Sequence, residues 1–206
     1  MSSMSKTMSM IIGITGGIAS GKSTVVHYLR QEGYQVIDAD QVVHELQAKG
    51  GRLYKALVTE FGQTILQENG ELDRPKLSKL IFSDPKKKER SALIQNQIIR
   101  QSLKVQKDQL AKTNAIVFMD IPLLIELNYL DWFDQVWLVY VNSGTQLKRL
   151  IDRNHYTKEE AEARINSQLA MEEKKAYADL IIDNNGSQKD LKNQLSSALK
   201  KIRGHA

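Results

Sequence analysis

One stretch of this 206-residue sequence decides its fold: Gly16-Gly17-Ile18-Ala19-Ser20-Gly21-Lys22-Ser23. It matches the pattern G-x-x-x-x-G-K-[ST], and the apolar residues 10–14 before it are typical of the buried strand that such a loop follows. Residues 23–29 are amphipathic at helical spacing, and Gly33 ends that segment. Strand, loop and helix follow one another in the required order, which argues against a chance match.

The loop predicts a site for a nucleoside triphosphate. Its glycines let successive backbone N–H groups face inward, where a Cβ would prevent close approach to phosphate oxygens. Lys22 adds a positive charge at the β- and γ-phosphates, Ser23 supplies a hydroxyl for Mg²⁺, and the following helix points its positive dipole end at the same phosphates. The expected nucleotide-binding residues of the loop are Gly17, Ile18, Ala19, Ser20, Gly21, Lys22, Ser23 and Thr24.

The amino-acid composition argues against a disulfide-bonded protein and against a membrane-spanning one. The chain is 41% hydrophobic and has no cysteine, which excludes disulfides and thiolate metal sites and suits a cytoplasmic location. No apolar run approaches the roughly 18 residues of a membrane-spanning helix, so we expect no membrane partner. Residues 1–9 are polar and lack the core of a secretory signal, so we expect a flexible leader or a misplaced start, without function.

The net charge of +5 raises the question of nucleic-acid binding. The basic runs at 86–88 and 200–203 have no interleaved aromatic residues for base stacking, so we expect no nucleic-acid partner. A mildly basic surface equally suits an enzyme whose substrates are polyanions.

The rest of the chain predicts an α/β fold of the P-loop NTPase type. Apolar strand signals alternate with helical segments, which indicates a parallel five-stranded sheet with helices on both faces and ligands at the carboxyl ends of the strands. Residues 52–113 show only helical periodicity and form a helical insertion within a core of residues 10–51 and 114–206. The later strands are expected at 34–38, 115–120, 135–141 and 180–183, and helices from Gln41 and at 87–112, 144–153, 158–175 and 188–202.

Carboxylates stand at the ends of two predicted strands, where a P-loop fold opens its active site. Asp38 and Asp40 follow the second strand, and Asp120 ends the third in the manner of a Walker B residue near Mg²⁺. Two alternatives stay open, because Asp120 also suits a turn or a helix N-cap and Asp40 also suits the N-cap of the helix from Gln41.

Three arginines indicate a cationic lid at about residues 149–168. Arg149 and Arg153 are four residues apart on one face of a predicted helix, and Arg164 follows across a break. Phosphoryl transfer needs alignment, exclusion of water and positive charge, which closing arginines supply. The alternative is a solvated surface on which they pair with Glu159, Glu160 or Glu162.

The sequence resembles the dephospho-CoA kinase family, in that family's order from residue 11 to residue 186. The resembling pieces are residues 13–23, Asp38-Ala39-Asp40 with His44, Phe61-Gly62, residues 70–74, residues 120–124 with Glu126, Gln146 with Arg149 and Arg153, residues 163–165 with Gln168, Ala178-Asp179 and residues 183–186.

The resemblance implies a helical substrate-binding insertion and transfer of the γ-phosphate of ATP to the 3′-hydroxyl of dephospho-CoA, the last step of coenzyme A synthesis. It makes Asp40, Lys22 and Arg153 the catalytic residues, with Asp40 accepting the hydroxyl proton. Ser23 and Asp120 would hold Mg²⁺, and Asp38 would support it through water or orient the base. The implied acceptor-binding residues are Asp38, Asp40, His44, Asp73, Arg74 and Leu123. Arg149 would stack on adenine, Arg153 would approach the phosphates, and Asn184 and Asn185 would lie near the base.

The sequence differs from the usual family pattern at two places, and two other functions remain as alternatives. Asn96-Gln97 stands where the family often has His-Pro, and the loss of that proline leaves the local geometry of the insertion, and any acceptor contact there, open. Ile125 stands where the family often has Phe. The first rival is another small-molecule P-loop kinase, such as a nucleoside monophosphate kinase. The second is a nucleotide-dependent switch or nucleic-acid-binding ATPase, although the Asn-Lys-x-Asp of a guanine-specific switch is absent.

Overall fold

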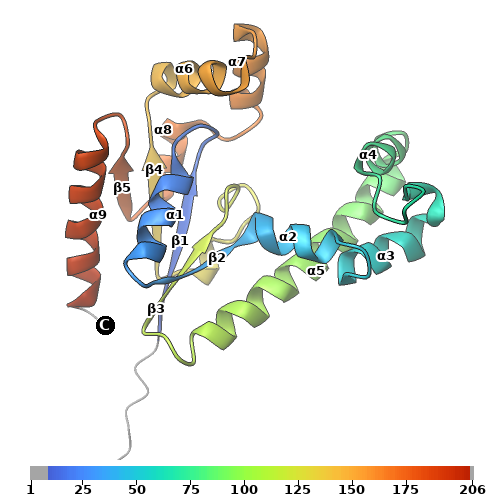
Figure 1. Ribbon diagram of the computed structural model, residues 1–206, viewed down its shortest axis with the longest axis horizontal. Coiled ribbons are helices and arrows are strands. Elements are labelled where there is room, and N and C mark those ends of the chain that lie inside the picture. Colours follow the sequence, from blue (N-terminus) through green and yellow to red (C-terminus); the bar gives the residue numbers. More distant parts are fainter. Residues whose placement is uncertain (1–8, 205–206) are drawn as a thin grey trace, which may run out of the picture. The chain divides into compact units, whose positions relative to one another are not determined.

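The computed structural model describes residues 9–204 and confirms the α/β fold with a five-stranded sheet of order β2-β3-β1-β4-β5 (Figure 1). Of the predicted leader, all but Ser9 lies outside the described residues. The pairs β1–β3, β1–β4 and β4–β5 are parallel, so their carboxyl ends lie at one edge of the sheet. The strands are β1 (Met10–Gly16), β2 (Gln35–Asp38), β3 (Ile116–Asp120), β4 (Gln135–Tyr140) and β5 (Leu180–Asp183).

The chain divides into two compact units. Residues 9–37 and 109–204 form the unit that we call the core unit, and Asp38–Asp108 form the helical unit. The predicted division into a core and an insertion at 52–113 stays a prediction about domain organisation.

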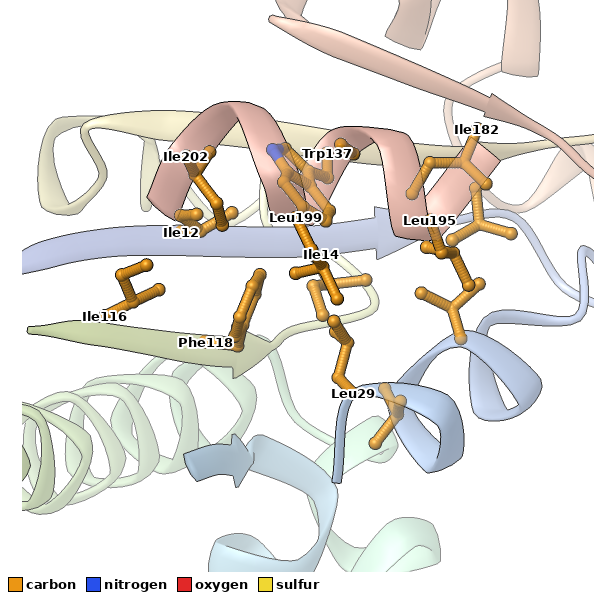
Figure 2. Close-up of a cluster of buried hydrophobic side chains, with 14 of the residues drawn as sticks. Ile12, Ile14, Leu29, Ile116, Phe118, Trp137, Ile182, Leu195, Leu199 and Ile202 are labelled. Atoms are coloured by element: carbon orange, nitrogen blue, oxygen red, sulfur yellow. The ribbon is translucent and has the colours of Figure 1, made fainter. Parts of the chain in front are cut away.

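Alternate residues of the strands build one face of the core. Ile12 and Ile14 of β1 lie between Phe118 of β3 and Trp137 of β4, and all four side chains are fully buried (Figure 2). Helices α1 (Lys22–Gln31) and α9 (Gln188–Arg203) cover this face with Leu29, Leu195, Leu199 and Ile202. Burial of each such side chain contributes about 1.5–3 kcal/mol, so this cluster fixes the strand that leads into the phosphate-binding loop.

On β1 a glycine permits close packing of the loop that follows β3. A Cβ on Gly13 would lie 2.5 Å from Leu124 Cδ1 and 3.0 Å from the ring of Phe133. The missing side chain therefore lets the segment after Asp120 approach β1, and with it the start of the phosphate-binding loop.

The prediction of one long helix over residues 158–175 is wrong, because the chain forms two separate helices there. α7 (Lys158–Asn166) begins at a capping box of Thr157 and Glu160, and α8 (Met171–Lys174) follows a break. Within the break Leu169 N donates to the Glu126 carboxylate (3.1 Å) and Ala170 N donates to Glu173 (3.1 Å). These side-chain acceptors replace the intrahelical carbonyls that a continuous helix would use. The preceding helix is α6 (Ser143–Asn154).

The helical unit has its own apolar core of Leu53, Leu57, Ile65, Leu72 and Leu77. Its helices are α2 (Ala39–Gln47), α3 (Arg52–Phe61), α4 (Arg74–Phe82) and α5 (Pro85–Leu110). With Asn96-Gln97 in place of His-Pro, α5 contains no proline after Pro85 and runs unbroken for 26 residues. No helix in residues 9–204 is long and apolar enough to span a membrane.

Candidate active site

The phosphate-binding loop leaves β1 at Gly16 and enters α1 at Lys22. Ala19 (φ 59°) and Gly21 (φ 86°) adopt left-handed conformations, and a Cβ on Gly21 would collide with the side-chain amide of Asn184. The first N–H groups of a helix have no intrahelical acceptor, so those of Lys22 and Ser23 are available to phosphate oxygens. The loop therefore has the backbone of an anion site.

Four side chains from the last third of the sequence hold this loop. Met171 Sδ accepts from Gly17 N (3.1 Å), and Gln168 Oε1 accepts from Ile18 N (3.0 Å). Gln146 Nε2 donates to Ile18 O (2.9 Å), and Asn184 Nδ2 donates to Ser20 O (2.8 Å). Sequence reasoning missed these roles of Gln146, Gln168 and Met171. The two glutamines were among the residues that carry the family resemblance, which was the available signal.

Lys22 and Asp120 form an ion pair, with Lys22 Nζ donating to Asp120 Oδ1. Asp120 is the last residue of β3, stands opposite Ile14 of β1 and is only 6% exposed. It does not cap a helix, because residues 122–128 form turns. The structure thus brings together the predicted phosphate-binding lysine and one predicted metal ligand.

Arg149 and Asn184 lie together at the loop. Arg149 is half-buried on α6, and its Nη2 donates to Asn184 O (2.9 Å). Asn185 instead ties the loop after β5 to the start of α6, because its Oδ1 accepts from Asn142 N (3.0 Å) and Asn142 Nδ2 (2.8 Å). Both asparagines therefore have structural roles besides those predicted for nucleotide binding.

The other two lid arginines are placed differently. Arg153 is exposed and its Nε donates to Asn154 Oδ1 (2.8 Å), whereas Arg164 stacks on the ring of Tyr156 at 4.3 Å. In residues 9–204 these arginines form none of the ion pairs with Glu159, Glu160 or Glu162 considered as the alternative. Arg153 is therefore an exposed cation one helical turn from Arg149.

Within the helical unit, two of the predicted acceptor-binding residues line one groove. His44 and Arg74 contribute to a groove of about 390 Å³. Asp40 is exposed in the first turn of α2 and precedes His44 by four residues, so both project from the same side of that helix. The remaining lining residues are Gln47, Ala48, Lys49, Gln67, Glu71, Leu72 and Pro75. Leu123, also predicted to bind the acceptor, lies half-buried in the core unit.

Two other predicted carboxylates cap helices. Asp38 Oδ1 accepts from Gln41 N (3.0 Å), so Asp38, and not Asp40, is the N-cap of α2. The helix therefore begins at Ala39 instead of the predicted Gln41. Asp73 Oδ1 accepts from Lys76 N (2.9 Å) at the start of α4. That backbone hydrogen bond, followed by the side-chain contact with Lys76, lowers the pKa of Asp73. Asp38 and Asp40 are only two residues apart, and either carboxylate suits an N-cap in sequence, which is why the pattern alone left the cap open as an alternative role for Asp40.

Sequence comparisons match one family of known proteins. The family model described as dephospho-CoA kinase matches residues 10–190. A dephospho-CoA kinase of Streptococcus mutans is 62% identical over 195 residues, which is 95% of this chain and 98% of that protein.

Solved structures give the same result. A crystal structure from Thermus thermophilus superimposes with a TM-score of 0.79 at 32% identity, covering 95% of this chain and 98% of that chain. A dephospho-CoA kinase from Campylobacter jejuni has a TM-score of 0.73 at 28% identity, with the same coverage of both chains. The chain therefore belongs to the dephospho-CoA kinase family, as its motifs predicted, and is an ATP-dependent kinase.

Proposed function

We propose that this chain transfers the γ-phosphate of ATP to the 3′-hydroxyl of dephospho-CoA, giving ADP and coenzyme A. The observation that carries the proposal is a phosphate-binding loop whose Lys22 pairs with Asp120, within residues 10–190 that match the family model. The names of the relatives support dephospho-CoA as the acceptor. The cysteine-free composition is in keeping with our proposal that the enzyme acts in the cytoplasm.

The core unit would hold the donor. Backbone N–H groups of the loop and Lys22 would bind the β- and γ-phosphates and keep the γ-phosphorus in line with the attacking oxygen. Arg149 would contact adenine together with Asn184 and Asn185, and Arg153 would close on the phosphates. This alignment and the accumulated positive charge are what phosphoryl transfer requires from a protein.

Ser23 and Asp120 would hold Mg²⁺ together with phosphate oxygens. Magnesium sites in kinases usually take one or two carboxylates and leave the remaining positions to phosphates and water, and the buried Asp120 carboxylate at the loop fits that donor set. When bound, the ion would neutralise charge that develops between the β- and γ-phosphates.

The helical unit would bind the acceptor in the groove of His44 and Arg74, with Lys49 adding a further cation. Asp40, on the same side of α2 as His44, would accept the proton of the 3′-hydroxyl. As that proton leaves, the hydroxyl oxygen forms a bond to the γ-phosphorus, and the bond from phosphorus to the β–γ bridging oxygen breaks. ADP carries away the electron pair, and Asp40 later returns the proton to solvent.

Activity of the purified chain tests the proposal. Incubation with Mg²⁺-ATP and dephospho-CoA should yield coenzyme A, detected by its mass, in step with ADP release. Nucleoside monophosphates serve as the competing acceptors, and their phosphorylation without coenzyme A formation would support the other small-molecule kinase. Salt-dependent binding of DNA or RNA with no transfer to any acceptor would support the switch or ATPase.

Arg74→Ala is expected to raise the KM for dephospho-CoA by about tenfold or more, because a hydrogen bond to a charged group contributes about 1.5–3 kcal/mol. The KM for ATP should not change, since Arg74 lines the groove proposed for the acceptor and is not among the residues proposed to bind ATP. Initial rates with each substrate varied in turn make the measurement.

Arg52→Ala is the matched control for this variant. Arg52 is also an exposed arginine of the helical unit, but its Nη2 donates to Gln101 (2.8 Å) and it does not line the groove. Both KM values should match those of the parent enzyme. An Arg74→Ala enzyme with the parent KM for dephospho-CoA would remove this groove as the acceptor site.

A further inference from the structure

We infer that the buried ion pair between Lys174 and Glu126 positions the segment that holds the phosphate-binding loop, and thereby sets the affinity for ATP. The side chain of Lys174 is completely buried, and its Nζ lies 2.8 Å from Glu126 Oε1. Neither residue belongs to the predicted donor, acceptor or metal site. The inference rests on the proposed ATP site but adds a positioning residue to it.

Glu126 clamps the break between α7 and α8 from two directions. Its Oε1 accepts from Leu169 N (3.1 Å) at the start of that segment and pairs with Lys174 at the end of α8. Glu126 itself lies six residues after Asp120, in the loop packed close to β1 at Gly13. One carboxylate therefore ties residues 169–174 to the loop that follows the predicted metal ligand.

The clamped segment carries two of the contacts to the phosphate-binding loop. Gln168, directly before it, accepts from Ile18 N (3.0 Å), and Met171, inside it, accepts from Gly17 N (3.1 Å). The fit at Gly17 is tight, because a Cβ there would lie 2.7 Å from Met171 Sδ. A small shift of residues 168–171 would therefore release or displace the first half of the loop.

Glu126 is the one carboxylate among residues 9–204 that forms an ion pair with Lys174. Its 2.8 Å contact lies outside hydrogen-bond geometry, and among residues 9–204 neither Lys174 Nζ nor Glu126 Oε2 has a hydrogen-bond partner. A buried ammonium is unfavourable unless an opposite charge compensates it, and here Glu126 is that charge. Loss of either charge should therefore move the segment and not merely weaken a redundant contact.

The experiment measures the dissociation constant for a non-hydrolysable ATP analogue with Mg²⁺, and the KM for dephospho-CoA, at a temperature where circular dichroism shows each variant folded. Lys174→Met should raise the dissociation constant by roughly tenfold, since each of the two loop contacts is worth a factor of about three in an equilibrium constant. Glu126→Gln keeps an oxygen for Leu169 N and removes only the charge, so it should weaken binding in the same direction. Lys174→Arg keeps the charge and should restore most of the affinity. The KM for dephospho-CoA should stay at the parent value throughout.

Lys175→Met is the matched control. Lys175 is the neighbouring residue, but its ion pair with Glu172 (2.7 Å) is exposed, and it stacks on the ring of Tyr140 at 3.8 Å. The affinity for the ATP analogue should not change, because none of these contacts reaches the loop.

The outcomes separate the inference from the proposed function. A parent enzyme that does not bind the ATP analogue contradicts the proposed function. A folded Lys174→Met variant that binds as tightly as the parent, or one that loses affinity for both substrates equally, overturns the positioning role. If Lys174→Met does not fold, the Glu126→Gln and Gln168→Leu variants test the positioning role instead. An affinity for the ATP analogue equal to that of the parent in both variants would also overturn that role.

Discussion

Asp40→Asn is expected to lower kcat by about 10²-fold or more, which is the scale of losing a general base. Asparagine keeps the size and polarity of the side chain but cannot accept the proton of the 3′-hydroxyl. Affinity for ATP should stay at the parent value, because Asp40 is proposed to act on the acceptor hydroxyl and does not belong to the phosphate-binding loop. Steady-state rates at saturating substrates, together with direct ATP binding, make the measurement.

Glu45→Gln controls for the loss of a negative charge on the same helix. Glu45 is exposed on α2 and accepts from Gln41 Nε2 (2.9 Å), but it does not line the groove of His44 and Arg74. Its kcat should equal that of the parent. Equal turnover by Asp40→Asn and the parent enzyme would exclude Asp40 as the base.

Lys22→Ala is expected to reduce kcat/KM for ATP by about 10²- to 10³-fold, the cost of removing one preorganised charge from the transition state. The change also removes the cation that pairs with the buried carboxylate of Asp120, so a lower Tm should accompany the loss of rate. Initial rates over a range of ATP concentrations and thermal unfolding of the free protein measure the two effects.

Arg30→Ala is a suitable comparison, because Arg30 is an exposed cation in the last turn of the same helix, α1. It should leave kcat/KM for ATP unchanged. If Lys22→Ala retained the parent kcat/KM, the assignment of residues 16–23 as the donor site would fail.

Sequence patterns predicted the parts of the site that depend on local chemistry. The glycines and Lys22 define the loop by their spacing, and an apolar run ending in Asp120 defines the third strand and its terminal carboxylate. These features need only the residues next to them, and the structure has both the strand–loop–helix unit and the contact between Lys22 and Asp120.

The parts that sequence reasoning missed depend on residues far away in the chain. The periodicity of 158–175 does not reveal that Glu126 accepts from Leu169 N and ends helical hydrogen bonding there. The same holds for Gln168 and Met171, whose partners on the loop are 150 and 154 residues earlier. Only the three-dimensional approach of these segments shows that the side chains are acceptors for the loop.

These long separations have a consequence for the order in which a ribosome makes the protein. The phosphate-binding loop is synthesised before the residues that hold it, because these lie 128 to 164 residues later in the chain. They are Gln146, Gln168, Met171 and Asn184. Contacts between such distant segments form late, because long stretches of chain must be ordered before they are gained. A nascent chain therefore contains the phosphate-binding loop long before it contains the side chains that stabilise the loop. The donor site should reach its final structure only after residue 184 has left the exit tunnel.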